Sequence, residues 1–94
     1  MSIGLLTLLI SIPDCHTLKQ KRSRIQPVLA RLHREFNIAA AEMDHQDSHV
    51  EATIQCVALS TSNREVQAYL QHVVDYFPQH WPDLEILQYR IELI

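Results

Sequence analysis

The side chains best suited to chemistry in this sequence are the lysines and arginines of one short segment. Six of the eight basic residues lie between positions 19 and 34, a window that contains no aspartate or glutamate. The rest of the 94-residue chain carries two basic residues against eleven acidic ones. Basic side chains grouped on one helix contact phosphate groups, and free N–H groups at the helix start add to the grip. The candidate phosphate ligands are Lys19, Lys21, Arg22 and Arg31.

The same cations have a second interpretation, which the sequence leaves open. Positive charge in the first turn of a helix opposes the helix dipole by about 0.3–1 kcal/mol per residue, so a structural role needs compensating acids. Glu42, Asp44 and Asp47 belong to a segment that the predicted topology brings to the same end, and they are suitable ion-pair partners. The cations farther along the helix also fit a solvated face: Arg24, Arg31 and Arg34.

Other reactive side chains form weaker patterns. Cys15 and His16 are adjacent, and adjacent residues often point apart, which disfavours a cysteine–histidine nucleophile. Glu42 and Asp44, two apart on a strand, would face the same side as a carboxylate pair. Histidines in the loops are of metal-ligand type, but the chain has no CxxC and no HxxxH on a predicted helix. These loop histidines are His16, His45, His49 and His80. We therefore predict no catalytic residue, no metal and no cofactor.

Hydrophobic periodicity predicts the elements that position these groups. The predicted strands cover residues 3–12, 38–44, 50–60 and 84–93. The predicted helices begin at Thr17 and Ser62, each the first residue of a capping-box pattern, and extend to Phe36 and Phe77. Because a proline inside a helix costs about 3 kcal/mol, we expect Pro27 to kink or break the first helix. Residues 78–83 should form a loop.

The order β-α-β-β-α-β predicts a single ferredoxin-like α+β domain over residues 1–94. Two helices would cover one face of a four-stranded antiparallel sheet, with right-handed crossovers giving the strand order 4-1-3-2. This topology brings the start of the basic helix and the loops at 13–17, 45–49 and 78–83 to one end of the sandwich. Trp81, in the last of these loops, either caps the core or is an exposed anchor.

The second face of the predicted sheet is open. Leu5, Leu9 and Val57 should lie on it, and none of the residues expected there on the two central strands is aromatic. Base stacking on the sheet, as in RNA-recognition domains, is therefore disfavoured. A semi-apolar face suits a protein partner or a second copy of the chain, while scattered surface aliphatics are also common.

Three stretches together resemble the YlxP-like (DUF503) family of small bacterial proteins: 13–22 (PDCHTLKQKR), 37–47 (NIAAAEMDHQD) and 84–94. The resemblance covers almost the whole chain, and it implies a ferredoxin-like fold with no established activity. Family members are often encoded near translation-initiation and ribosome-maturation factors, which implies association with RNA or the ribosome. The characteristic polar residues of the family fall on Lys19, Lys21, Arg22, Glu42, Asp44, Gln46 and Asp47.

Composition indicates a soluble cytoplasmic protein without a membrane segment. The longest apolar run, residues 3–12, is shorter than the about 20 residues that span a bilayer, and no basic segment precedes it as in a signal peptide. Two cysteines without CxxC spacing indicate free thiols. We predict a non-enzymatic module that binds structured RNA or a ribosomal particle through phosphate contacts. The alternative is a protein-interaction or homodimerisation module that uses the open sheet face.

Overall fold

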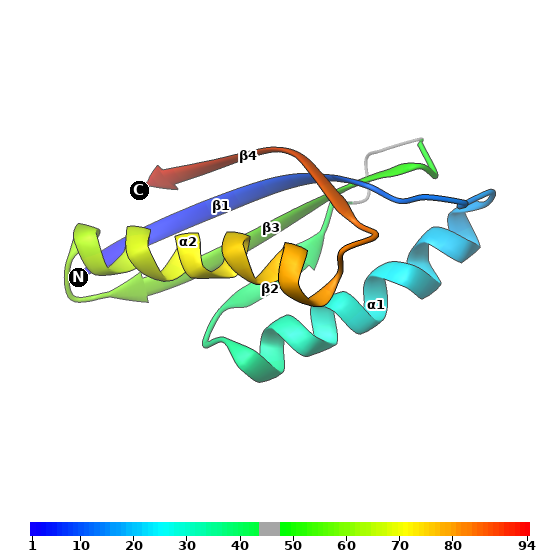
Figure 1. Ribbon diagram of the computed structural model, residues 1–94. Helices are drawn as coiled ribbons and strands as arrows, with labels where there is room; N and C mark the ends of the chain where they lie inside the picture. The colour runs from blue at the N-terminus through cyan, green and yellow to red at the C-terminus, as the bar shows by residue number, and fades with distance from the viewer. Residues whose placement is uncertain (44–47) are drawn as a thin grey trace.

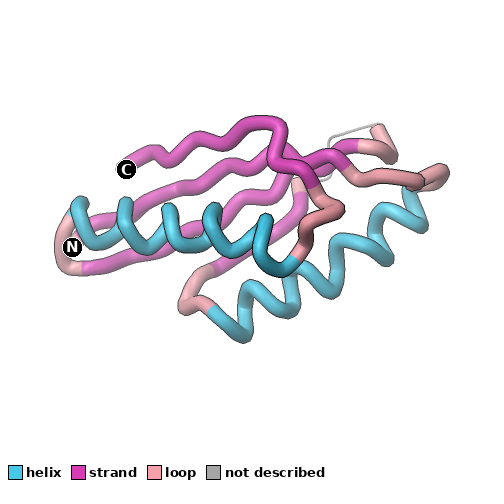
Figure 2. Tube along the Cα trace, in the orientation of Figure 1, coloured by secondary structure: helices cyan, strands magenta, loops and turns pink. Residues whose placement is uncertain are grey.

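The computed structural model describes residues 1–43 and 48–94, and the strands in these ranges form one antiparallel sheet. Its elements in chain order are β1 (Ser2–Ser11), α1 (Leu18–Glu35), β2 (Ala39–Glu42), β3 (Glu51–Ser60), α2 (Asn63–His80) and β4 (Glu85–Leu93). The strand order is β2-β3-β1-β4, and both helices cover the same face of the sheet (Figures 1 and 2). The predicted ferredoxin-like α+β fold and its strand order are confirmed.

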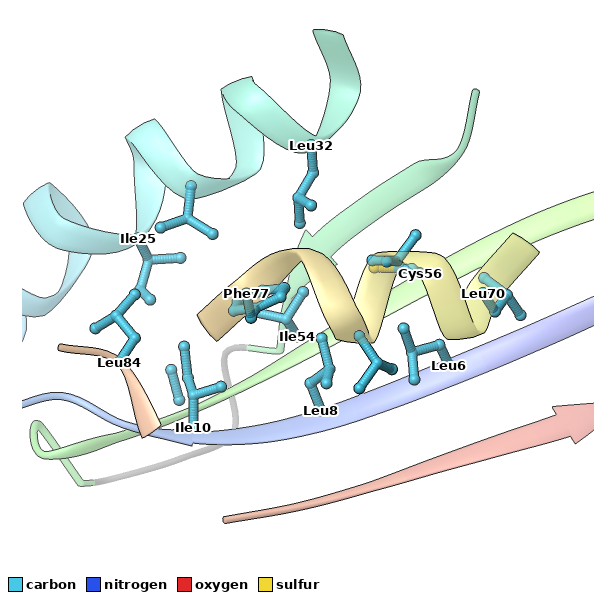
Figure 3. Packing of buried hydrophobic residues seen from close by; sticks show 14 of the residues in the cluster. Leu6, Leu8, Ile10, Ile25, Leu32, Ile54, Cys56, Leu70, Phe77 and Leu84 are labelled. Carbon is cyan, nitrogen blue, oxygen red and sulfur yellow. The ribbon is translucent and has the colours of Figure 1, made fainter. Parts of the chain in front are cut away.

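Alternation along the two central strands builds the core. Leu6, Leu8 and Ile10 of β1 face the helices and are fully buried, because every second side chain of a strand points to the same side. Leu6 lies opposite Cys56 and Leu8 opposite Ile54 in the β1–β3 pairing, and both partners are also fully buried. The helices close over this layer with Ile25, Leu32, Leu70 and Phe77 (Figure 3).

Side-chain caps begin both helices where the sequence predicts them. The Thr17 hydroxyl accepts a hydrogen bond from the Gln20 N–H at 3.0 Å, which satisfies one of the unpaired amides of the first turn. The Gln20 side chain reaches back and accepts from the His16 N–H at 2.7 Å, one residue before the position used in a capping box. Ser62 caps α2 by accepting from the Glu65 N–H at 3.2 Å.

Both helices pass through a proline, so the break that Pro27 could cause is absent and the expected loop at residues 78–83 is partly helical. α1 is continuous across Pro27, and α2 extends through Pro78 to His80, so the predicted loop starts later. A proline removes the bond to the carbonyl four residues earlier. Pro27 and Ser23, whose carbonyl is affected, are both exposed, so water can replace that bond. Pro78 lies near the end of α2, where few helical bonds remain to be disturbed. Neither helix in the described ranges has an apolar stretch long enough to cross a bilayer.

α2 lies close against β1 at Gly4, the only glycine of the sequence. A Cβ atom placed on Gly4 would collide with the Val66 side chain and would lie 2.8 Å from Cδ1 of Leu70. A larger residue at this position would therefore force the Val66 and Leu70 side chains of α2 to shift.

β4 is an edge strand with one irregularity near its start. Ile10 of β1 lies opposite Ile86, whereas Leu9 lies opposite Gln88, so Leu87 is an extra residue that bulges out of the pairing. Beyond this point the register with β1 continues without interruption to Leu93.

Candidate functional site

The basic segment of α1 contains cations that hold the fold together and cations that stay exposed. Lys21 belongs to the first group, because it is only 5% exposed. Its Nζ donates to the backbone oxygens of Ser48 (2.7 Å) and Glu51 (2.8 Å) and lies 3.5 Å from Oε2 of Glu42. The ammonium thus fixes the start of α1 to β2 and to the start of β3, and these contacts direct it into the protein.

Arg24 joins two loops at the same end of the sandwich. Its Nη1 donates to the Pro13 carbonyl at 3.0 Å, and its Nη2 donates to Oδ2 of Asp83 at 2.6 Å. Pro13 follows β1 and Asp83 precedes β4, so these contacts show that the predicted topology does gather the two connections beside the start of α1 (Figure 1).

Arg31, a predicted phosphate ligand, takes part in the packing of α1 against α2. Its Nε donates to the Tyr76 hydroxyl oxygen at 2.8 Å, and its guanidinium carbon lies 5.7 Å from the centre of the Tyr76 ring. The two terminal nitrogens of the guanidinium have no partner among the described residues, so Arg31 keeps donors for a ligand at the edge of this interface.

Lys19 and Arg22 are the exposed cations of the first turns. Neither forms a hydrogen bond or ion pair with any residue in the ranges 1–43 and 48–94. The first turn of α1 contains no acidic residue, so the positive end of the helix dipole adds to their charge. Arg34, one residue before the helix end, is also exposed, and its one charged contact with the described residues is 3.9 Å between its Nε and Oε1 of Glu35. We call Lys19, Arg22 and Arg34 the exposed basic surface.

The polar residues that follow the second strand are described in part. Glu42 is half-buried and forms an ion pair with Lys21. For these two charges the structure therefore has the ion pair that was the alternative to phosphate binding. The remaining motif residues lie outside the described ranges: Asp44, Gln46 and Asp47.

The cysteine and histidine side chains of the loops have separate structural surroundings. Cys15 is buried and its thiol donates to the Thr17 carbonyl at 3.5 Å, whereas His16 is exposed. The His80 ring is stacked on Tyr76 with 3.7 Å between centroids. Within the described ranges, no three histidine, cysteine, aspartate or glutamate side chains are grouped closely enough to hold a metal. His45 lies outside those ranges.

The open face of the sheet has the predicted side chains. Leu5 lies opposite Val57 and Leu9 opposite Thr53 in the β1–β3 pairing, on the side away from both helices. Val57 is 39% exposed, while Leu5 and Leu9 are half-buried. A hollow of about 450 Å³ adjoins these side chains, and its lining consists of Thr7, Leu9, Thr53, Gln88, Tyr89 and Arg90. These residues lie on the face that both helices leave open, and their use as an interaction surface stays a prediction.

Sequence reasoning missed a cluster of aromatic rings between the helices. Phe36, at the end of α1, makes edge-to-face contacts with Tyr69 (5.9 Å between centroids) and Tyr76 (5.1 Å) of α2. The Tyr69 hydroxyl also accepts from the Asn37 N–H at 2.7 Å. The seven-residue spacing of the two tyrosines on α2 is the signal that predicts one shared face. Trp81 lies 4.9 Å from the buried Phe77 ring, which supports the interpretation of Trp81 as a cap on the core.

The fold and the basic helix define a small ferredoxin-like protein whose positive charge is concentrated on α1. Residues 3–91 match the family described as "Protein of unknown function (DUF503)", and the chain belongs to that family. It is 31% identical over 71 residues to the "Uncharacterized protein YlxP" of Bacillus subtilis (strain 168), an alignment that covers 72% of this chain and 77% of the relative. Family membership confirms the motif-based resemblance and assigns no activity.

Proposed function

We propose that this chain is a non-enzymatic module that binds structured RNA, free or in a ribosomal particle, through phosphate contacts on α1. The observation that carries the proposal is the exposure of Lys19 and Arg22 on a helix start without acidic residues. Two cations held at an N-terminal turn attract an anion through both their own charges and the helix dipole.

The internal contacts of Lys21 assign it a positioning role within this proposal. Its ammonium holds the first turns of α1 against the backbone of Ser48 and Glu51. A fixed helix start presents Lys19 and Arg22 at a constant spacing, so less conformational entropy is lost when a rigid RNA backbone binds. Arg31 and Arg34 continue the line of cations along the same helix. At a rise of about 1.5 Å per residue, Arg34 lies about 18 Å beyond Arg22 along the helix axis.

Phosphate positioning fits the described surface better than base recognition does. The open sheet face carries Thr7, Gln55 and Val57 at its centre, and Gln55 donates to the Thr7 hydroxyl at 3.2 Å. RNA-recognition sheets stack bases on aromatic rings at such positions. Contacts limited to phosphates fix the orientation of a bound RNA without reading its sequence.

The test is fluorescence anisotropy with a labelled synthetic RNA hairpin at several KCl concentrations. We expect the double variant Lys19→Ala/Arg22→Ala to bind about tenfold more weakly and to lower the slope of log affinity against log salt by about 2, one for each lost phosphate contact. Arg64→Ala, which removes an exposed cation from the start of α2, is the matched control and should leave the slope unchanged.

Two results would overturn the RNA proposal. One is affinity of the wild-type chain that does not depend on salt, and the other is a double variant that binds like the wild type. Circular dichroism of the double variant is the folding control. We expect a spectrum like that of the wild type, because both substituted side chains are exposed.

The open sheet face supports a second candidate, a protein-binding module. Both helices leave this face uncovered (Figure 1), and Leu5, Leu9 and Val57 give it apolar character. A pull-down from cell lysate with and without nuclease separates the two candidates. Partners that persist after nuclease treatment and are lost with Val57→Asp favour the sheet face, whereas partners lost on nuclease treatment favour RNA.

A further inference from the structure

The outer edge of β4 carries backbone groups without a partner in the described chain. β4 pairs with β1 on one side only, and its other side forms the margin of the sheet (Figure 2). The Ile94 N–H donates to the Ile3 carbonyl at 2.8 Å, which fixes the direction of every second peptide group in this regular stretch. Even-numbered residues therefore bond to β1, and Tyr89, Ile91 and Leu93 direct their N–H and C=O groups away from the sheet.

The side chains of this edge do not prevent pairing with another strand, and two of the apolar ones are exposed. Edge strands usually avoid association through proline, bulges or charged side chains, and like charges placed opposite each other oppose pairing. From Gln88 to Leu93 the strand has no proline and a regular register, and its two charges, on Arg90 and Glu92, have opposite sign. On the helix side, Tyr89 is 46% exposed and Leu93 is 43% exposed, although both lie on an otherwise buried face of the sheet.

We propose that β4 pairs antiparallel with β4 of a second copy of this chain, about a two-fold axis that passes through Ile91. In this register Ile91 lies opposite Ile91 of the partner subunit, and Tyr89 lies opposite Leu93 of the partner subunit. These positions have outward-directed peptide groups on both strands, so each pair exchanges two N–H···O bonds. The two sheets become one continuous sheet with both pairs of helices on the same side.

Charge selects this register from its neighbours. With the axis at Ile91, Arg90 lies opposite Glu92 of the partner subunit, and Glu92 lies opposite Arg90 of the partner subunit. The close Arg90–Glu92 contact within each chain, 3.0 Å between Nε and Oε1, then becomes part of a four-charge network. Moving the axis to Arg90 or to Glu92 places two like charges directly opposite each other, which destabilises a strand pair.

The surface beside the strand also suits a second copy. A groove of about 450 Å³ lies between the end of α2 and β4, where Val74, Pro78, Leu87 and Tyr89 form part of its lining. Tyr89 occupies both the groove and the proposed strand pair. Leu93 of the partner subunit would therefore cover apolar surface that a single copy leaves in water.

Sedimentation velocity of the untagged protein over a concentration series provides the test. We expect a mass near twice 10.9 kDa at high concentration. Arg90→Glu alone and Glu92→Arg alone each place like charges opposite one another and should raise the dissociation constant about tenfold. A mixture of the two variants should form heterodimers in preference to either homodimer, because every cross-strand pair is then oppositely charged. Glu85→Arg, on β4 but outside the paired stretch, is the control and should not change the mass.

Several outcomes would overturn the proposal. A wild-type chain that stays monomeric at millimolar concentration excludes it. A dimer that is insensitive to both charge reversals uses another surface, and its loss in Val57→Asp would assign it to the open sheet face. Failure of the two single-charge variants to associate when mixed also contradicts the register.

Discussion

Lys21 shows how one side chain changes the interpretation of a basic segment. Its position suggests a phosphate ligand, yet its Nζ contacts two backbone oxygens and the Glu42 carboxylate. The backbone partners, Ser48 and Glu51, are 27 and 30 residues farther along the chain. Sequence patterns carry no signal for a lysine bonded to distant carbonyl groups, so this assignment required the structure.

Removing the Lys21 ammonium should destabilise the fold strongly. We expect Lys21→Met to lower the free energy of unfolding by about 3 kcal/mol, because it keeps much of the side-chain volume but leaves Glu42 and two carbonyls without their cation. Urea denaturation followed by circular dichroism measures the change. Lys19→Met is the control, and its effect should stay within about 0.5 kcal/mol because Lys19 is exposed. Equal stability of both variants would contradict the buried contacts of Lys21.

Cys56 should make stability depend on pH in the alkaline range. Burial raises the pKa of its thiol to about 12 from an ordinary value of 9.0. Above pH 9 the unfolded chain loses this proton while the folded chain retains it, so the free energy of unfolding falls by about 1.4 kcal/mol per pH unit until the folded pKa is reached. Cys56→Ala should lack this contribution. Denaturation of both proteins at a series of pH values gives the difference, and parallel curves would contradict the prediction.

At the level of elements, the contact between α2 and β1 sets how the helix lies on the sheet. Gly4 has no side chain to keep Val66 and Leu70 at a distance, and both of these residues are fully buried. The first two turns of α2 therefore depend on one position in β1, although more than fifty residues separate the end of β1 from the start of α2.

Adding a methyl group at Gly4 should displace α2. We expect Gly4→Ala to lower the free energy of unfolding by about 1–3 kcal/mol through overpacking. The double variant Gly4→Ala/Val66→Ala should lose less than the sum of its single changes, since the smaller residue makes room for the methyl group. Ser2→Ala, at the start of the same strand, should be nearly neutral. Additive losses in thermal denaturation would show that the two positions do not compete for space.

Periodicity predicted the order and type of all the described elements because it reflects which side of a strand or helix is buried. It placed strand ends within two residues, but it did not predict that α1 continues unbroken through Pro27 or that α2 continues through Pro78. A proline is tolerated or not according to the exposure of the carbonyl it leaves unbonded, which depends on tertiary packing. The sequence could predict the candidate site only as a segment rich in basic residues. Which of these residues are exposed, such as Lys19, and which are bonded inside the fold, such as Lys21, depends on tertiary contacts.

For the whole molecule, strand order separates the two proposed surfaces. β2 and β4 form opposite margins of the sheet, and α1 lies on the β2 side (Figure 1). RNA bound to the exposed basic surface would therefore not compete with a second copy at β4. The effects of Lys19→Ala/Arg22→Ala on RNA affinity and of Arg90→Glu on mass should be independent, and each experiment tests its own proposal.

The hydrogen bond from Ile94 to Ile3 has a consequence for engineering the chain. It places the beginning of β1 beside the conclusion of β4, so a few glycines would suffice to connect Ile94 with Met1 into a ring. Such a circular permutant, reopened in the turn around Thr61, would retain every strand pairing described above. Its new chain ends, to which a reporter could be fused, would lie at the end of the sandwich opposite the cations of the first turn of α1.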